Sequence, residues 1–251
     1  MTDDKLAVLI DADNVPYKNV KEMLEEISKN GTPTIKRIYA DWTKPTVSGW
    51  KNVLLENAIT PIQQYSYTTG KNSSDSALII DAMDILYSEK VNGFCIVSSD
   101  SDFTRLATRL REAGMNVIGF GEKKTPKPFI SACDKFIYLE ILNDTEEVEK
   151  DSENTVSKKT QKPKSKKEPL SKVDSRTIKL ITESIDDLGD EDGWTFLGNL
   201  GNFILKKKPD FDPRNFGFLK LLPLIRSIGK IEIDERETGM NNIRHIYVRV
   251  K

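Results

Sequence analysis

The sequence of 251 residues predicts an α/β protein with a Rossmann-like parallel sheet, followed by a small winged-helix domain. Three observations carry this prediction. Apolar runs alternate with helical patterns over residues 1–143, which is typical of a parallel sheet with crossover helices. A strongly charged segment then interrupts the pattern. Residues 172–251 combine three helical patterns with an alternating hairpin.

The predicted strands of the first domain are short apolar or β-rich runs. KLAVLI and GFCIVS each contain an unbroken apolar run, as expected for strands covered on both faces. The predicted strands are residues 5–10, 34–40, 59–67, 93–98, 115–120 and 136–139. The predicted helices run from Pro16 to the stop signal Asn30-Gly31, over 46–57, 74–90 and 102–113, and from Pro126.

A linker is predicted over residues 144–171. Residues 144–155 hold one lysine against six acidic residues, and residues 156–173 hold seven lysines against one glutamate. A segment with few aliphatic and no aromatic residues buries too little apolar surface to offset its ordering entropy. We therefore expect domains at 1–143 and 172–251 joined by a disordered linker, whose lysines act either as a solvated spacer or as a polyanion-binding arm.

The second domain is expected to consist of three helices and a hairpin. The helices are residues 174–188, 194–207 and 216–227, with Trp194, Leu197, Leu200 and Ile204 inward in the second. The strands are residues 230–235 and 244–250, around a turn that contains Gly239. Three helices followed by a hairpin describe a winged helix.

Composition excludes several classes of function. His245 is the only histidine, so histidine-rich zinc sites and Ser–His–Asp triads have almost nothing to build on. No apolar run approaches the roughly 20 residues of a membrane helix, and the N-terminus lacks the basic region of a signal peptide. Cys95 and Cys133 lie in apolar segments and are expected to be reduced. We expect a cytoplasmic protein with no membrane partner.

Carboxylates follow the predicted strands at the edge where open parallel sheets bind ligands. Asp11 follows the first strand, Asp100 and Asp102 follow the fourth, and Asp75 opens the long helix. If the first and fourth strands are neighbours, these acids meet where the winding reverses. Two charges about 4 Å apart repel by roughly 4 kcal/mol at an effective dielectric near 20. Raised pKa values or a bound cation must compensate, and oxygen ligands suit Mg²⁺ or Mn²⁺.

Three further polar residues are auxiliary candidates for this site. Asp13 and Asn14 follow the first-strand acid, and Asp81 lies on the long helix. Structural alternatives stay open: Asp102 and Asp75 are good N-caps, Asp13 closes a turn, and a helical acid such as Asp81 is usually only solvated. Asn14 either positions a ligand or shapes the turn.

Basic and aromatic residues border the same edge and suggest a path for single-stranded nucleic acid. Trp42 and Lys44 follow the second strand, and Lys123, Lys124 and Lys127 follow the fifth. A solvated loop is the alternative. In the second domain, the candidate RNA-binding lysines are Lys206, Lys207 and Lys208. Their position at a helix C-terminus also suits the helix dipole without RNA. The hairpin face with His245, Tyr247 and Arg249 either stacks on a base or is solvated.

The first domain resembles the NYN domain of the bacterial LabA-like branch, in the PIN-like nuclease superfamily. The resemblance covers residues 5–142 and rests on LAVLIDADNVP, YTTGKNSSDSALIIDAMD, FCIVSSDSDFTRLATRLREAGMNVIGFGEKKTPKPF and CDKFIY. It implies a Mg²⁺- or Mn²⁺-dependent ribonuclease. By motif, the residues that match the family's catalytic and metal-binding acids are Asp11, Asp75, Asp100 and Asp102. Ser99 stands where many NYN domains have glycine.

The second domain resembles the LOTUS domain, also called OST-HTH. The resemblance covers residues 172–250 and rests on GWTFLGNLGNFILKKKPDFDPRNFGFLKLLPLI. It implies RNA binding or docking of an RNA-processing protein. The domain has no net charge, so it lacks the broad basic footprint of a strong phosphate binder.

Three functions compete on these observations. The preferred one is a ribonuclease in which Mg²⁺ or Mn²⁺ at the acidic site activates water, while the second domain and the lysine-rich linker recruit RNA. A non-catalytic RNA-binding adaptor is the first alternative. A phosphatase of the haloacid dehalogenase type is the second, because Asp11-Ala12-Asp13 has its DxD pattern, although no cap insertion is evident.

Overall fold

The computed structural model describes residues 4–65, 73–144, 169–237 and 244–251. The chain divides into two compact units, Met1–Asn154 and Thr155–Lys251. Most of the expected linker, residues 145–168, lies outside the described residues. Ser171, at the end of that expected linker, donates its N–H to the carbonyl of Asn215 at 2.8 Å, so it is bonded to the second unit.

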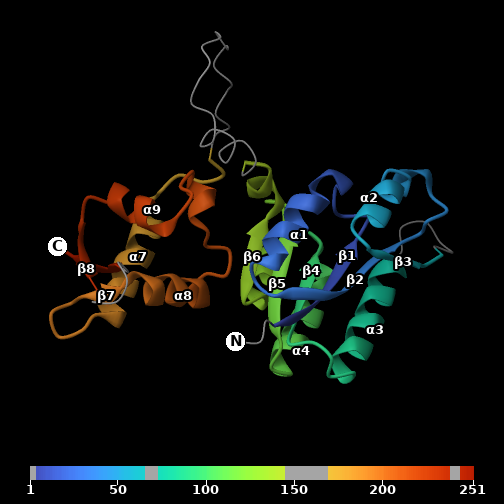
Figure 1. Ribbon diagram of the computed structural model, residues 1–251, viewed down its shortest axis with the longest axis horizontal. Coiled ribbons are helices and arrows are strands. Elements are labelled where there is room, and N and C mark those ends of the chain that lie inside the picture. Colours follow the sequence, from blue (N-terminus) through green and yellow to red (C-terminus); the bar gives the residue numbers. More distant parts are fainter. Residues whose placement is uncertain (1–3, 66–72, 145–168, 238–243) are drawn as a thin grey trace, which may run out of the picture. The chain divides into compact units, whose positions relative to one another are not determined.

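The first unit is built on a six-stranded parallel sheet in the order β3-β2-β1-β4-β5-β6 (Figure 1). The strands are β1 (Lys5–Asp11), β2 (Thr32–Ala40), β3 (Thr60–Gln63), β4 (Gly93–Val97), β5 (Asn116–Gly121) and β6 (Lys135–Tyr138). β1 and β4 are hydrogen-bonded neighbours, which meets the condition for the acids to converge, and the winding reverses between them. All residues of β4 are buried, which explains its unbroken apolar run.

Helices connect the strands and cover the sheet. They are α1 (Val20–Ser28), α2 (Trp50–Glu56), α3 (Ser73–Tyr87), α4 (Thr104–Glu112) and α5 (Lys127–Ala132), with 3-10 turns η1 (Tyr17–Asn19), η2 (Pro45–Val47), η3 (Ser101–Phe103) and η4 (Leu139–Asp144). Side chains of α3, α4 and α5, among them Leu78, Leu106 and Phe129, share one core with Leu9 and Ile96 of the central strands. The predicted order of strands and helices is confirmed. β3 ends at Gln63, where its pairing with β2 ends, and residues 66–67 of the predicted run 59–67 lie outside the described residues.

The second unit consists of α7 (Ser175–Leu188), β7 (Thr195–Phe196), α8 (Leu197–Lys207), η5 (Pro213–Phe216), α9 (Leu221–Ser227), β8 (Ile231–Glu237) and β9 (Arg244–Val250). An antiparallel sheet in the order β7-β9-β8 packs with the helices around Ile181, Leu200, Ile204, Leu224 and Val248. This arrangement is winged-helix-like, as the sequence predicts. The expected turn at Gly239 lies outside the described residues.

Two helices of this unit begin later in the structure than the sequence predicts. The helix expected from Trp194 starts at Leu197, because Thr195 and Phe196 pair with β9. The helix expected from residue 216 starts at Leu221. There Gly217 takes the left-handed conformation, at φ 81°, and ends η5, so the helix cannot run through it. In the described part of the chain, no helix combines the length and the apolar character needed to cross a membrane.

Candidate active site

Three aspartates gather at the C-terminal edge of the first unit's sheet. Asp75 lies in the first turn of α3, and Asp100 and Asp102 lie in the segment that follows β4. One carboxylate oxygen from each lies within 4.8 Å of the others. The structure thus brings together three of the predicted site residues, which come from segments 25 or more positions apart in the sequence.

Asp11 lies beside this group at the end of β1 and is almost completely buried. Its Oδ1 accepts the N–H of Asp13 at 3.2 Å, and its Oδ2 accepts bonds from Asn14 Nδ2 at 2.7 Å and Ser98 Oγ at 2.8 Å. Burial raises the pKa of Asp11, and these hydrogen bonds oppose the rise. The turn expected at Asp13 is therefore closed by the Asp11 side chain.

Two serines after β4 hold the acidic segment, and sequence reasoning missed the role of the first. Ser98 is fully buried; its hydroxyl donates to Asp11 and accepts the N–H of Asp100 at 3.1 Å. Ser99 Oγ accepts the N–H of Glu122 at 2.9 Å, which ties the segment to the one after β5. A small hydroxyl residue at the end of an apolar strand is the only signal of this role in the sequence.

Asp100, rather than Asp102, is the N-cap. Asp100 Oδ1 accepts the N–H of Asp102 at 3.0 Å where η3 begins. The expectation that Asp102 caps the helix is wrong because a 3-10 turn precedes α4, so the capping position moves two residues back. Asp102 itself lies exposed at the rim of the acidic group.

Asp75 carries the strongest electrostatic signature of the site. Burial, followed by the charges of Asp11, Asp100, Asp102 and Asp13, raises the pKa of Asp75 to about 7. Among the described residues, no lysine or arginine forms an ion pair with Asp11, Asp75 or Asp100. A carboxyl group that titrates near neutrality among like charges is characteristic of a functional site.

A hard divalent cation fits this donor set. All the side chains are carboxylates, which are the ligands that Mg²⁺ and Mn²⁺ prefer. Bonds of about 2.1 Å to an octahedral ion place ligand oxygens about 3–4 Å apart. The oxygens of Asp75, Asp100 and Asp102 lie within a slightly wider span, so small side-chain rotations would bring them to an ion.

Asp81 does not belong to this cluster. Its carboxylate is bonded to Arg37 and to the hydroxyl of Tyr39, both on β2. The solvated alternative does not describe Asp81, since these bonds join α3 to the sheet, and its auxiliary role stays a prediction. Asn14, by contrast, contacts Asp11 directly, and Asp13 lies exposed next to it.

The predicted basic rim follows β2 and β5 at the same edge as the acids. Trp42 is half-buried and donates its Nε1–H to the carbonyl of Ile62 at 3.0 Å. Lys124 pairs with Glu122 at 2.5 Å, whereas Lys127, the first residue of α5, is exposed. The two remaining members of the rim, Lys44 and Lys123, are also exposed. Part of the rim is thus already engaged within the protein.

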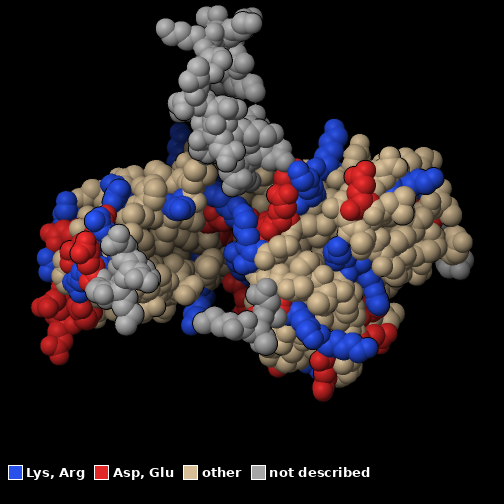
Figure 2. Space-filling model, viewed as in Figure 1, with Lys and Arg blue, Asp and Glu red and all other residues tan. Residues whose placement is uncertain are grey.

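The candidate residues of the second unit contact its own side chains. Lys207 Nζ lies 2.6 Å from Asp187 Oδ2 and 4.5 Å from the centre of the Phe203 ring, while Lys206 is exposed and Lys208 is half-buried. The hairpin residues His245, Tyr247 and Arg249 are half-buried and contact other side chains of this unit. His245 and Tyr247 contact the ring of Phe196, and Arg236 lies over the ring of Tyr247. Arg249 lies over the ring of Trp194 and pairs with Glu232. Basic and acidic side chains are interspersed over this unit (Figure 2).

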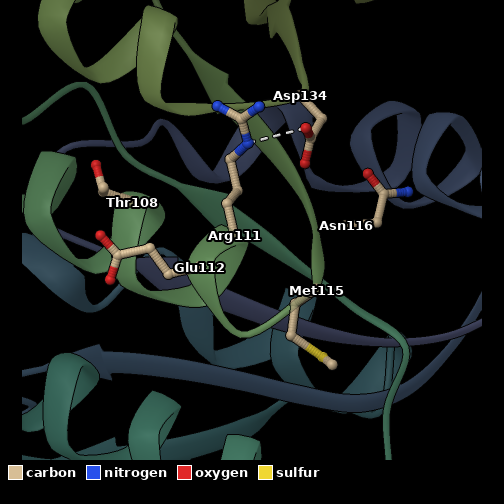
Figure 3. A pocket seen from close by; sticks show the side chains of 7 residues that line it. Thr108, Arg111, Glu112, Met115, Asn116 and Asp134 are labelled. Carbon is tan, nitrogen blue, oxygen red and sulfur yellow. Dashed lines mark ion pairs between the residues drawn. The ribbon is translucent and has the colours of Figure 1, made fainter.

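A shallow depression of about 630 Å³ lies at the opposite edge of the first unit's sheet, at the start of β5 (Figure 3). It is lined by Thr108, Arg111, Glu112, Gly114, Met115, Asn116 and Asp134. Arg111 Nε pairs with Asp134 Oδ1 at 2.9 Å, and the other oxygen of Asp134 accepts the N–H of Val117. These bonds tie α4 and the residue before β6 to the start of β5, so Asp134 has a structural role here.

Family models match both units. The NYN domain model matches residues 5–140, and the OST-HTH/LOTUS domain model matches residues 168–243. A protein of unknown function from Vibrio parahaemolyticus is 20% identical over 53% of this chain and 91% of its own, with a TM-score of 0.45. An uncharacterized protein from Nitrosomonas europaea is 27% identical over 38% of this chain and 92% of its own, with a TM-score of 0.29. No curated protein matches the chain.

Proposed function

Because this chain belongs to the NYN domain family, we propose that it is a metal-dependent endoribonuclease that cleaves single-stranded RNA. NYN domains have a nuclease-type fold, and the second unit matches a class of RNA-binding domain, OST-HTH/LOTUS. The observation that carries the proposal is the convergence of Asp75, Asp100 and Asp102 within 4.8 Å. Asp11 adds its charge to that of the three.

Each acidic residue has a role in this proposal. Asp75, Asp100 and Asp102 hold Mg²⁺ or Mn²⁺, and Asp11 completes the site directly or through water. A cation held there would supply an activated water and would neutralise charge on the scissile phosphate. Ser98 and Asn14 keep the Asp11 carboxylate oriented by donating hydrogen bonds to one of its oxygens. This chemistry needs no histidine, in keeping with the single histidine of the chain.

RNA reaches the acidic site along the basic rim in this proposal. Trp42 offers a ring for stacking, and the lysines that contact phosphates are Lys44, Lys123, Lys124 and Lys127. The second unit and the lysine-rich linker recruit the RNA, or an RNA-processing protein that delivers it. Lys206 and Lys208 are secondary candidates for RNA contact, since Lys207 already pairs with Asp187.

The proposal also covers the organisation and location of the chain. We place the catalytic domain at residues 1–143, the linker at 144–171 and the RNA-recruiting domain at 172–251. We assign the first domain to the LabA-like branch on its four matching segments and place the protein in the cytoplasm. Limited proteolysis of the purified chain tests these boundaries, and we expect cleavage inside residues 144–171.

A cleavage assay tests the function. The purified chain is incubated with end-labelled single-stranded RNA in Mn²⁺, in Mg²⁺ and in EDTA. We expect metal-dependent cleavage that falls by about 10³-fold or more in Asp11→Asn and Asp100→Asn, because each removes a charge from the cation site. Asp84→Asn, on the exposed side of α3, is the matched control and keeps full activity. Unchanged cleavage in both site variants would refute the assignment.

The same assay separates the alternatives. Tight RNA binding without turnover in any divalent ion would indicate the non-catalytic RNA-binding adaptor. Covalent phosphorylation of Asp11 by a small phosphoester would indicate the haloacid dehalogenase-type phosphatase. The family match does not favour that phosphatase, because the NYN domain model covers Asp11-Ala12-Asp13.

A further inference from the structure

Asp81 joins helix α3 to strand β2 through two polar side chains. We propose that this network of Arg37, Tyr39 and Asp81 positions Asp75 for the cation, so that all three are positioning residues of the acidic site. The inference rests on the proposed function, because it assigns these residues a task only if a cation binds at Asp75.

The geometry of the network suits a fixed anchor. Arg37 and Tyr39 are two residues apart on β2, so their side chains leave the same face of the strand. Arg37 Nη1 donates to Oδ1 of Asp81 and Tyr39 Oη donates to Oδ2. Both carboxylate oxygens of Asp81 are therefore held, one of them by a charge-assisted bond with a preferred direction.

Apolar packing alone does not fix the position of α3 on the sheet. The face of α3 against the sheet consists of aliphatic residues, among them Leu78, Ala82 and Ile85. Burial of aliphatic side chains stabilises the contact but has little directional preference. Asp81 lies next to these residues on the helix, so its two directional bonds define the rotation and axial position of α3 on β2.

Tyr39 links this anchor to the other side of the acidic site. It is fully buried and lies opposite Asp11 in the register between β1 and β2. Its carbonyl accepts the N–H of Ala12, the residue after Asp11, at 3.2 Å. One residue thus holds α3 through its side chain and the Asp11 turn through its main chain. Burial and the bond to Asp81 raise the pKa of the Tyr39 phenol, so it stays a donor at physiological pH.

A displacement at Asp81 reaches Asp75 through a rigid helix. The two residues are six positions apart on α3, which corresponds to about 9 Å along the helix axis. Metal ligands must be held within about 0.5 Å of their productive positions. A small roll or slip of α3 after loss of the anchor would therefore weaken cation binding, although no ligand had been removed.

Two variants and a matched control test this inference. Tyr39→Phe removes only the hydroxyl and leaves the buried ring, and Asp81→Asn removes the charge at nearly constant volume. Asp84→Asn removes a charge from the same helix at an exposed position. The measurement is the Kd for Mn²⁺ by calorimetry on the full chain without RNA. We expect Kd to rise about fivefold in the two network variants and to stay within about twofold in the control.

Two further readouts separate positioning from general stability. With RNA, we expect kcat to fall in Tyr39→Phe while KM stays unchanged. A network that is only structural would lower the melting temperature in EDTA without changing the Mn²⁺ Kd, and that result would overturn the inference. If Asp81→Asn does not fold, Tyr39→Phe decides alone.

The outcome also distinguishes this inference from the proposed function. If the unaltered protein binds Mn²⁺ and cleaves RNA, and Tyr39→Phe binds Mn²⁺ equally well, the positioning role is wrong and the ribonuclease assignment stands. If the unaltered protein does not bind Mn²⁺, the proposed function is wrong and the positioning role is wrong with it.

Discussion

The acidic cluster of the first unit and the ion-paired acids of the second unit are arranged in opposite ways. In the first unit, Asp75, Asp100 and Asp102 lie next to one another, and burial together with the neighbouring charges raises the pKa of Asp75 to about 7. In the second unit, acids near the strands and turns meet cations. Asp212 lies 2.7 Å from Arg214, and Glu232 lies 2.6 Å from Arg249.

This difference separates binding chemistry from structural chemistry. An acid paired with an arginine is stabilised in the folded state and needs nothing further. Acids gathered with other acids destabilise the folded state unless a proton or a cation joins them. We therefore interpret the acidic cluster of the first unit as a ligand site, and the ion pairs of the second unit as part of its fold.

The largest expected effect concerns the pH dependence of the metal-free protein. The folded state raises the pKa of Asp75 from 3.8 to about 7, so it binds this proton more tightly than the unfolded state does. Stability from this group is therefore full below about pH 4 and is lost as the pH rises through about 7. The loss corresponds to up to about 4 kcal/mol. Urea unfolding in EDTA at about pH 4.5 and about pH 8 measures it.

The variant Asp75→Asn turns this expectation into a difference measurement. The part of the loss that comes from Asp75 should be absent from the variant, because its side chain carries no charge at either pH, whereas the part from Asp11, whose pKa is also raised, should remain. Mn²⁺ at about pH 8 should restore stability to the unaltered protein and not to the variant. If both proteins lose the same stability between the two pH values, the acidic cluster does not carry the repulsion that the comparison assigns to it.

The second prediction tests the paired acids of the second unit. Asp212 accepts the main-chain N–H of Arg214 and pairs with its guanidinium, and both side chains are largely buried. Asp212→Ala should lower the free energy of unfolding of this unit by about 3 kcal/mol, because it removes the carboxylate that pairs with a largely buried guanidinium. Hydrogen exchange of amides in α7 and α8 measures this unit within the full chain.

Asp234→Ala is the matched control for that experiment. Asp234 also pairs with an arginine, Arg236, but both side chains are about 43% exposed. Solvent screens such a pair, so its loss should cost less than about 1 kcal/mol. Equal effects of the two substitutions would mean that burial is not what makes the Asp212 pair structural.

The third prediction compares two adjacent buried serines. The Ser98 hydroxyl bonds to Asp11 and to the main chain of Asp100, whereas the Ser99 hydroxyl accepts the main-chain N–H of Glu122. Ser98→Ala should weaken Mn²⁺ binding about tenfold, because it frees the Asp11 carboxylate and the Asp100 main chain. Ser99→Ala should leave the Mn²⁺ Kd unchanged within about twofold. Calorimetric titration measures both, and similar Kd values would show that Ser98 does not orient the site.

The acids of the site were predictable from the sequence because a simple geometric rule places them. Parallel strands end at the same edge of a sheet, so Asp11 and Asp100 must lie close together once β1 and β4 are neighbours. Apolar runs and stop signals were sufficient to predict the succession of strands and helices along the chain, because each of these signals depends only on local sequence.

The partners of those acids were not predictable, because they depend on contacts between distant segments. Nothing near Asp81 in the sequence indicates that Arg37 and Tyr39, about 40 positions earlier, satisfy its charge. The position at which α8 begins was also not predictable, because it too depends on a contact between distant segments. Thr195 and Phe196 continue a helical pattern, but pairing with β9, some 50 positions later, draws them into a strand. Tertiary pairing overrides local propensity at such positions.

The smallest expected effect separates two exposed lysines that the sequence treats alike. Lys127 is the first residue of α5, in the connection that follows β5, whereas Lys207 pairs with Asp187 and lies over the ring of Phe203. Lys127→Ala should weaken RNA binding a few-fold and lower the slope of log K against log salt by about 0.7, as expected for one lost phosphate contact with a single strand.

Lys207→Ala should leave that slope unchanged and lower the stability of the second unit by less than about 1 kcal/mol, because an exposed pair contributes little. Fluorescence anisotropy with labelled single-stranded RNA over a series of salt concentrations measures both slopes. If Lys207→Ala lowers the slope as much as Lys127→Ala does, Lys207 contacts phosphate even though it is already paired with Asp187. In that case, pairing within the unit would no longer distinguish structural charges from those that bind RNA.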